Sequence, residues 1–418
     1  MKRHTWRLSR WLPALLFLCA WMAALCFAQQ CGPLIQGAAV RWTGEGAGVS
    51  PADLCQAERW AAEDGSTSFP DLVLWQEQEN QILTDRTGER STPVRLLTVF
   101  GQADLLWPGA FLRGGWPVRG DIQGIALDEA AAAALWGSAD VLGETVEWNG
   151  NTYAVRGVFR GDDGLALIQT EESSTQAMDR AMLQFQDGGG GTETTAWLSQ
   201  NGFPVGQVTD LPLLGWILNS LAALPGLALG VVLLLRLGER LWRLRRSPLL
   251  LAQCLLPVLA AGGLTLWVLG FPWEIPDRLI PTRWSDFDFW TGLAGELTEE
   301  LWTALSGAMS ARDGLLWPAA LGCLVWALAA CALLAPAGRL RPETGTGLLL
   351  ACLGAAGSVF VLTLLFARMG GGAPGRTWWL LPPLWLAADY GLRRHDGWLT
   401  ADITPPGPAR PAGEEERL

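Results

Sequence analysis

Six long apolar stretches constrain the fold of this 418-residue chain more than any other feature. A helix needs about 20 apolar residues to cross the hydrocarbon core of a bilayer, and backbone in lipid must satisfy its own hydrogen bonds. The stretches therefore predict about six transmembrane helices and exclude a soluble protein. They cover residues 11–28, 213–235, 249–269, 315–335, 347–366 and 377–392.

Two of these stretches have alternatives. The sixth is short and contains Pro382 and Pro383; if it only lies in the interface, the tail beyond Arg393 is outside rather than cytoplasmic. The first, within residues 1–28, could be a signal peptide cleaved after Ala28. Its run of about 18 apolar residues exceeds the usual h-region, which favours an uncleaved anchor.

Basic residues predict the orientation. They precede the first stretch and follow the second and the fourth, so the positive-inside rule places the N-terminus and these two linkers in the cytoplasm. Residues 29–212, with 25 acidic residues against 10 arginines, and residues 272–314 are then extracytoplasmic. The short outer turn 368–376 disagrees, because it has two arginines and no acid. The prediction is a multi-pass protein of a bacterial cell membrane.

Composition excludes several classes of function. The net charge is −11, whereas nucleic acid binding needs a basic surface. His4 and His395 are the only histidines and both are placed in the cytoplasm, which excludes a Ser-His-Asp triad or a histidine-ligated metal in the outer segment. Lys2 is the only lysine, so no Walker-A loop is present. We expect no catalytic residue, metal or cofactor, and we interpret adjacent acids such as Asp162 and Asp163 as a solvated turn.

Cysteine placement leaves one question open. Six of the eight cysteines lie in apolar stretches, where a small buried thiol is ordinary. Cys31 and Cys55 fall in the outer segment, where a disulfide is chemically permitted. The sequence does not decide whether they are bonded.

Local patterns predict an α+β domain in the outer segment. Apolar, β-branched runs predict strands at 71–75, 94–100 and 122–127. Asp128 caps an alanine-rich helix over 129–136 that Gly137 ends. Two alternating runs joined by Asn149-Gly150 predict a hairpin with a type I′ turn.

The order of these elements resembles the periplasmic core domain of MacB-type ABC permeases. The resemblance covers about residues 95–170, and Trp136 stands where phenylalanine is usual. It rests on Gly124–Asp128, Leu135-Trp-Gly137, Val141-Leu-Gly143, Val146, Asn149-Gly150, Tyr153 and Val155-Arg-Gly-Val158.

The resemblance implies a function as well as a fold. MacB-type and FtsX-like permeases have one helix before the outer domain and three after it. They dimerise, pair with an ATP-binding subunit and usually transmit motion to the outer domain. Here four or five helices are expected after the domain, and the chain has no nucleotide-binding part. The resemblance therefore implies a separate ABC ATP-binding subunit and a homo- or heterodimer with a permease.

The arginine-rich linker is the best candidate for contact with that subunit. Apolar and basic residues alternate at helical spacing, which predicts a short basic amphipathic helix at the membrane face. The alternative is a simple topology signal that contacts anionic lipid. The candidate coupling residues are Arg236, Arg240, Trp242, Arg243, Arg245 and Arg246.

Further patterns concern packing in and near the membrane. Gly226 and Gly230 form a GxxxG step, which suits packing within the chain or between copies. No Asp, Glu, Lys or His lies in the middle of a predicted span, which argues against a pump or secondary transporter. In the outer loop, Ser285 is predicted to cap an amphipathic helix with a stripe from Trp290 to Leu305, lying flat on the membrane or beneath the large domain.

Together these patterns predict a multi-pass α-helical membrane protein with a large extracytoplasmic α+β domain inserted after the first helix. The function expected is a permease-like subunit of an ABC transport or mechanotransmission complex. The alternative is a non-transporting scaffold whose outer domain binds a partner; a membrane-anchored hydrolase is poorly supported. The expected organisation is 1–28 first helix, 29–212 outer domain, 213–271 helices two and three, 272–314 outer loop, 315–392 helices four to six, and 393–418 a disordered cytoplasmic tail.

Overall fold

The chain forms two compact units in the computed structural model. The helical unit comprises Met1–Gln30, Leu218–Glu274 and Ala319–Leu418, and the sheet unit comprises Cys31–Ile217 and Ile275–Pro318. The structure describes residues 12–44, 46–65, 69–107, 111–161, 163–186, 188–244, 255, 259–260, 262–267, 276–281, 287–306, 310–338, 342, 344–368 and 381–403.

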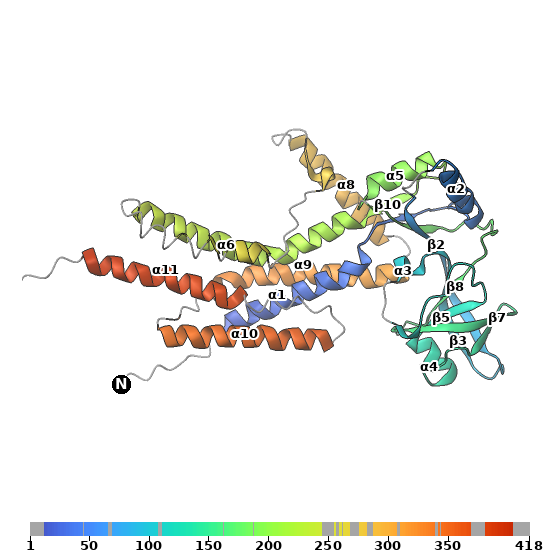
Figure 1. Cartoon of the computed structure of the whole chain (residues 1–418), viewed down its shortest axis with the longest axis horizontal. Helices are drawn as coiled ribbons and strands as arrows, with labels where there is room; N and C mark the ends of the chain where they lie inside the picture. Colours follow the sequence, from blue (N-terminus) through green and yellow to red (C-terminus); the bar gives the residue numbers. More distant parts are fainter. Residues whose placement is uncertain are drawn as a thin grey trace, which may run out of the picture. The chain divides into compact units, whose positions relative to one another are not determined.

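Four helices among the described residues are long and apolar enough to cross a membrane. The candidate spans are Leu12–Leu34, Leu211–Val232, Ala311–Ala337 and Gly345–Phe366. They correspond to the first, second, fourth and fifth predicted stretches, which confirms the prediction of a membrane protein. They belong to α1 (Leu12–Cys31), α6 (Leu211–Leu244), α9 (Ala311–Ala337) and α10 (Gly345–Arg368), drawn in Figure 1. Most of the third stretch lies outside the described residues, so the count of six stays a prediction.

Tryptophan side chains hold the helical unit together. The Trp21 indole of α1 donates to the Ala222 carbonyl of α6 at 2.9 Å and stacks on Trp385, with ring centroids 5.3 Å apart. Trp385 in turn donates to the Thr265 hydroxyl at 3.0 Å. Both indoles are almost fully buried, so each N–H has the partner that a buried polar group needs.

The sixth predicted stretch forms α11 (Leu381–Ile403), which is not among the candidate spans found in the described residues. It runs antiparallel to α10: the Cys352 thiol donates to the Pro383 carbonyl at 3.6 Å, and Arg393 Nη1 donates to the Pro342 carbonyl at 3.2 Å. Ten residues of helix rise about 15 Å, roughly half of a hydrocarbon core. The two bonds therefore join α11 to α10 and to the segment before it over about 15 Å of helix.

The sheet unit is built on one ten-stranded sheet. The strand order is β10-β1-β9-β2-β3-β8-β5-β7-β4, with β6 paired to β2 and β7. The strands are β1 (Ala38–Arg41), β2 (Asp71–Asp85), β3 (Ser91–Gly101), β4 (Phe111–Gly114), β5 (Gly124–Asp128), β6 (Thr145–Trp148), β7 (Asn151–Phe159), β8 (Leu165–Gln169), β9 (Arg180–Gln184) and β10 (Gln207–Asp210).

Two hydrophobic cores share this sheet. One includes residues of α2 (Pro51–Glu63) and α5 (Gly191–Gln200), and the other includes residues of α4 (Glu129–Trp136). The long strand β2 belongs to both, because Leu74 lies in the first core and Leu83 in the second. Between them the β2–β3 register shifts from Gln78 to Gln81, and Asn80 has a positive φ of 55°. This bulge separates the two cores along one strand.

Local sequence signals agree well with this sheet. The predicted strands at 71–75, 94–100 and 122–127 fall on β2, β3 and β5, although β2 extends ten residues further, to Asp85. The Asn149-Gly150 turn joins β6 to β7, and both residues have positive φ (49° and 78°), as a type I′ turn requires. The remaining described elements are the short η2 (Gly32–Leu34), α3 (Ala103–Leu106) and η3 (Asp277–Leu279), and the longer helix α8 (Phe287–Ser306). Ser285, the predicted cap of α8, lies outside the described residues.

The predicted cap of α4 gives a first testable prediction. Asp128 is fully buried and its Oδ1 accepts from the Ala131 N–H at 2.8 Å, while Gly137 ends the helix at φ 74°. We expect Asp128→Ala to lower the free energy of unfolding by about 0.5–2 kcal/mol, because a helix N–H loses its acceptor. Thermal unfolding in detergent measures this loss. Asp128→Asn is the control, since its side-chain oxygen can still accept; an equal loss in both variants would contradict the capping role.

Candidate functional site at the start of helix α9

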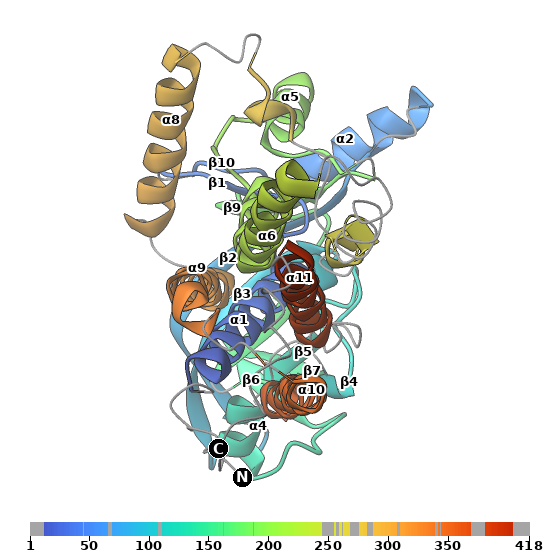
Figure 2. The same cartoon turned by 90° about the vertical axis from the view of Figure 1, so that its left-hand side faces the viewer.

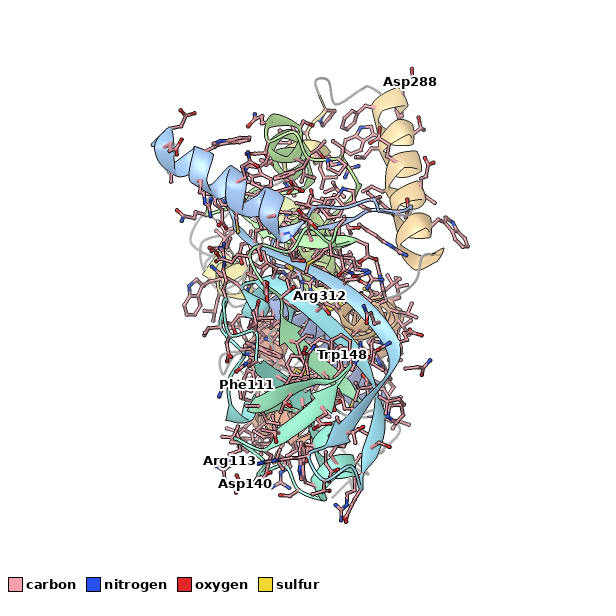
Figure 3. All side chains as sticks on the ribbon, turned by 90° about the vertical axis from the view of Figure 1, so that its right-hand side faces the viewer. Phe111, Arg113, Asp140, Trp148, Asp288 and Arg312 are labelled. Carbon is pink, nitrogen blue, oxygen red and sulfur yellow. The ribbon has the colours of Figure 1, made fainter. Side chains whose placement is uncertain are left out.

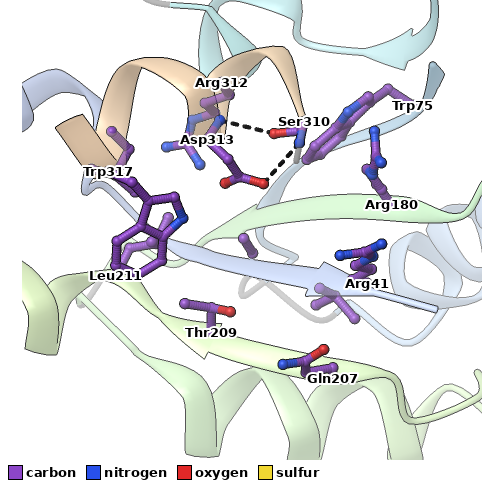
Figure 4. Close-up of a pocket in the computed structure, with 13 residues that line it drawn as sticks. Arg41, Trp75, Arg180, Gln207, Thr209, Leu211, Ser310, Arg312, Asp313 and Trp317 are labelled. Atoms are coloured by element: carbon purple, nitrogen blue, oxygen red, sulfur yellow. Dashed lines mark hydrogen bonds between the residues drawn. The ribbon is translucent and has the colours of Figure 1, made fainter. Parts of the chain in front are cut away.

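The candidate site is a cluster of buried charges where the first turn of α9 meets the sheet, entirely within the sheet unit. Glu77 lies on β2, and Arg180 is the first residue of the neighbouring strand β9. Ser310, Arg312 and Asp313 come from the start of α9 (Figure 4). We call these five residues the α9 clamp.

The centre of the α9 clamp is a buried ion pair. Arg180 Nη1 lies 2.9 Å from Glu77 Oε1, and the two side chains are only 9% and 7% exposed. The Trp75 indole also donates to Glu77 Oε1 at 3.2 Å. Breaking a buried pair by removing one partner leaves an uncompensated charge, which makes such a pair sensitive to substitution. The exposed Arg113–Asp140 pair, 3.7 Å apart, is a weak surface contact by comparison (Figure 3).

Glu77 also binds the N-terminus of α9. The Ala311 N–H donates to both carboxylate oxygens, at 3.2 and 3.1 Å. A carboxylate is favoured at this end of a helix, where N–H groups are unpaired and the helix dipole is positive. Burial nevertheless raises the pKa of Glu77 above its ordinary value, and the opposing effects of Arg180, Trp75 and the Ala311 N–H offset only part of that rise.

A capping box fixes the direction in which α9 starts. The Asp313 N–H donates to Ser310 Oγ at 3.0 Å, and the Ser310 N–H donates to Asp313 Oδ2 at 3.0 Å. Figure 4 draws both bonds. The two residues thus satisfy two backbone donors of the first turn reciprocally. The helix begins here, four residues before the apolar stretch predicted to start at residue 315.

Arg312 ties the same turn to the segment that follows α1. Its side chain is 3% exposed, and its Nη2 donates to the carbonyl of Leu34, the last residue of η2. Its Nε is buried and has no hydrogen-bond partner among the described residues. The α9 clamp therefore joins three distant parts of the sequence: the segment before β1, the adjacent strands β2 and β9, and the first turn of α9.

A small cavity of about 50 Å³ lies beside the α9 clamp. Its lining comes from β1, β2, β9 and β10 together with the first residues of α6 and the start of α9 (Figure 4). The site has no histidine or cysteine, and no group of three metal-ligating side chains is present anywhere in the described part of the chain. What the arrangement offers chemically is a set of strong, directional contacts between charged and polar groups.

The structure describes the backbone of the first part of the predicted coupling segment, residues 236–244. The backbone of α6 continues without a break to Leu244, so residues 236–244 extend the second membrane helix instead of forming a separate short one. The side chains of Arg236, Arg240, Trp242 and Arg243 lie outside what the structure describes, as do Arg245 and Arg246 entirely.

The predicted glycine step is only partly packed. Gly226 is buried, whereas a Cβ built on Gly230 would meet no atom within 4 Å. Both lie in α6: Gly226 directly follows the internal Pro225, and Gly230 lies about one turn further along. Close packing of Gly230 within the described chain is therefore not observed.

The possible disulfide is not formed in this structure. Cys31 and Cys55 are both buried, and no disulfide joins them. Instead, Arg119 donates to the Cys55 sulfur at 3.2 Å and to Glu58 Oε2 at 2.8 Å. Burial raises the pKa of the Cys55 thiol, which Arg119 lowers only in part, so this side chain acts as a packed neutral thiol.

Sequence reasoning missed the residues of the α9 clamp. Glu77 and Ala311 are 234 residues apart in the sequence, and nothing local to either points to the other. One signal was available: Ser310-Ala-Arg-Asp313 fits the pattern of a helix cap directly before an apolar run. The pattern locates the start of α9, but it does not identify what the start binds.

Comparison with known proteins gives similarity to solved structures only. No family model and no curated protein matches the chain. The periplasmic region of MacB from Actinobacillus actinomycetemcomitans is similar, with 16% identity, a TM-score of 0.34, and coverage of 43% of this chain and 91% of that one. The extracellular domain of the noncanonic ABC-type transporter YknZ from Gram-positive bacteria is also similar, with 14% identity, a TM-score of 0.31, and coverage of 42% and 98%. The MacB periplasmic region is the kind of domain that the sequence resembles.

Proposed function

We propose that the chain is the permease-like membrane subunit of an ABC-type complex, in which a separate ATP-binding subunit drives movement of the extracytoplasmic sheet unit. The observation that carries this proposal is the way in which helices α1 and α6 connect to the sheet. β1 follows α1 after six residues, β10 ends at the residue before α6, and the two strands pair antiparallel with Ala38 opposite Asp210. The chain segments on either side of the inserted unit thus meet on neighbouring strands.

The α9 clamp adds a third connection of the same kind. The first turn of α9 holds the sheet through the Ala311 N–H and Glu77, and it holds the segment before β1 through Arg312 and the Leu34 carbonyl. Buried charge-assisted bonds are directional and stiff compared with apolar contacts. A shift in any of the three segments would therefore be passed to the others instead of being absorbed.

The orientation has a direct test. Cysteine-accessibility labelling or reporter fusions at Gly114, Arg243, Asp288 and Arg410 are expected to give outside, inside, outside and inside. The positive-inside rule and the acidic balance of residues 29–212 support this result. A cytoplasmic result at Gly114 would reverse the topology and remove the proposed function with it.

Recovery of an ATPase partner tests the function itself. The intact protein is expected to co-purify with an ABC ATP-binding subunit. Replacing Arg240, Arg243, Arg245 and Arg246 by Ala should abolish recovery, since the basic segment is the proposed contact. The matched control replaces the exposed arginines Arg59, Arg86 and Arg160 of the sheet unit and should leave recovery unchanged.

The same experiment separates the two functions considered from the sequence. If the intact chain recovers no ATPase from its native membrane, the alternative of a non-transporting scaffold is the better description. If it recovers an ATPase that the four-arginine variant still binds, the coupling surface lies elsewhere. Analytical ultracentrifugation of the recovered complex would then report whether a homo- or heterodimer of permeases is present.

A further inference from the structure

The helical unit contains a partly open apolar cavity of about 340 Å³ that the proposed function does not use. Five helices line it, α1, α6, α9, α10 and α11, and Figure 2 views several of them nearly along their axes. Pockets that bind small ligands usually measure about 300–1,000 Å³. The lining includes Phe17, Leu229, Leu334, Ala355, Leu386 and Asp389.

Small side chains create this space. Ala335 on α9 and Ala355 on α10 each contribute only a methyl group to its lining. An apolar cavity of this kind is not filled by water, because water would find too few hydrogen-bond partners. Within membrane-spanning helices, the apolar molecule at high concentration is lipid. The cavity therefore matches an acyl chain better than a polar substrate.

One end of the cavity is charged. Asp389 lines it, and Arg393 one turn further along α11 donates to Asp389 Oδ2 at 3.0 Å. Arg393 Nη1 binds the Pro342 carbonyl, whereas its Nη2 is buried and has no hydrogen-bond partner among the described residues. A buried guanidinium N–H without an acceptor is costly. A phosphate oxygen would satisfy it, since arginine and phosphate form strong charge-assisted bonds.

We propose that this cavity binds one acyl chain of an anionic phospholipid, whose phosphate binds Arg393. The apolar cavity lies next to a guanidinium that has one buried N–H group without an acceptor among the described residues, because Arg393 binds the lining residue Asp389. This combination favours a molecule that is apolar along its length and anionic at its head. The α10–α11 pairing supports the geometry. Pro383, beside Cys352, lies about 15 Å of helix from Arg393, so chain and headgroup would occupy successive depths of one half of the bilayer.

Photocrosslinking of the full chain in lipid nanodiscs tests the proposal. The probe is phosphatidylglycerol with a diazirine on one acyl chain, compared with the same probe built on phosphatidylcholine. We expect labels on peptides of α10 and α11 that line the cavity. Ala355→Trp fills the cavity and should reduce this labelling at least fivefold. Leu350→Trp, at an exposed position of the same helix, is the matched control and should not reduce it.

Arg393→Gln examines the headgroup separately. It should lower the preference for phosphatidylglycerol over phosphatidylcholine about fivefold while leaving chain labelling in place. Ala335→Phe fills the cavity from α9 and provides a second test should Ala355→Trp not yield folded protein. Three results would each overturn the proposal. The first is equal labelling of the wild type and the filled variant, and the second is uniform labelling of exposed α10 positions. The third is full competition by a free fatty acid together with an unchanged headgroup preference in Arg393→Gln.

Discussion

Arg180→Met is expected to destabilise the sheet unit by about 3–5 kcal/mol at pH 8, because it leaves the Glu77 carboxylate buried without its ionic partner. For a unit of this size, that loss corresponds to a fall in Tm of roughly 6–20 °C. Tryptophan fluorescence during thermal unfolding in detergent measures it. Arg95→Met is the matched control: its pair with Glu79 is 3.4 Å long with side chains 35% and 69% exposed, so a loss under about 1 kcal/mol is expected.

The same variant has a defined pH dependence. Without Arg180, burial holds the pKa of Glu77 even further above its ordinary value than in the wild type. Between the ordinary and the raised pKa, the folded state binds a proton that the unfolded chain has released, so stability falls as pH rises through this window. The deficit should therefore be largest above the raised pKa of Glu77 and shrink as pH falls toward about 4.3.

A second substitution checks the assignment to the ion pair. Glu77→Gln combined with Arg180→Met removes both charges and should recover part of the stability lost in Arg180→Met alone. A double variant as unstable as the sum of its two single variants, or a pH-independent deficit, would contradict the role of the Glu77–Arg180 pair.

Gly37→Val should produce the second large effect, a loss of about 2–6 kcal/mol. Gly37 lies between α1 and β1 with φ 75°, and a Cβ there would lie less than 3.0 Å from the Leu183 carbonyl oxygen. A β-branched residue in this conformation costs about 1–3 kcal/mol. Overpacking against backbone that cannot move aside costs about 1–3 kcal/mol more. The pairing of Ala38 with Leu183 at the start of β1 would be the first part to break.

Gly88→Val separates these two costs. Gly88 has nearly the same φ, 72°, but no atom lies within 4 Å of the Cβ position. We expect only the conformational part of the loss, about 1–3 kcal/mol. The comparison uses Tm in the same detergent. Equal losses in Gly37→Val and Gly88→Val would mean that the close approach to Leu183 contributes nothing.

Features coded within a few residues could be predicted from the sequence. The Asn149-Gly150 hairpin and the α4 helix between Asp128 and Gly137 depend on turn and cap chemistry that each segment carries itself. The apolar spans follow from bilayer thickness alone. The second half of β2 was missed because the polar run from Gln76 to Gln81 is typical of a loop, whereas in the structure β3 pairs with it and β6 pairs with its end.

The α9 clamp could not be predicted, for a different reason. Glu77, Arg180 and Arg312 are each unremarkable in the sequence: a carboxylate in a polar run, an arginine after an aspartate, and an arginine at the end of an outer loop. Their role comes from burial and from long-range pairing, which only the folded sheet defines. The pairing of α11 with α10 is similar, since hydropathy reports the length of an apolar run but not which helix it packs against.

The bulged strand β2 has a consequence for how the sheet unit comes apart. Leu74 anchors one hydrophobic cluster and Leu83 the other, and no linker separates them. Neither half can be removed or unfolded alone, because the loss of its part of β2 would expose the hydrophobic core of the other half. We therefore expect the sheet unit to unfold in a single all-or-none transition, whether unfolding is followed by heating or by proteolysis.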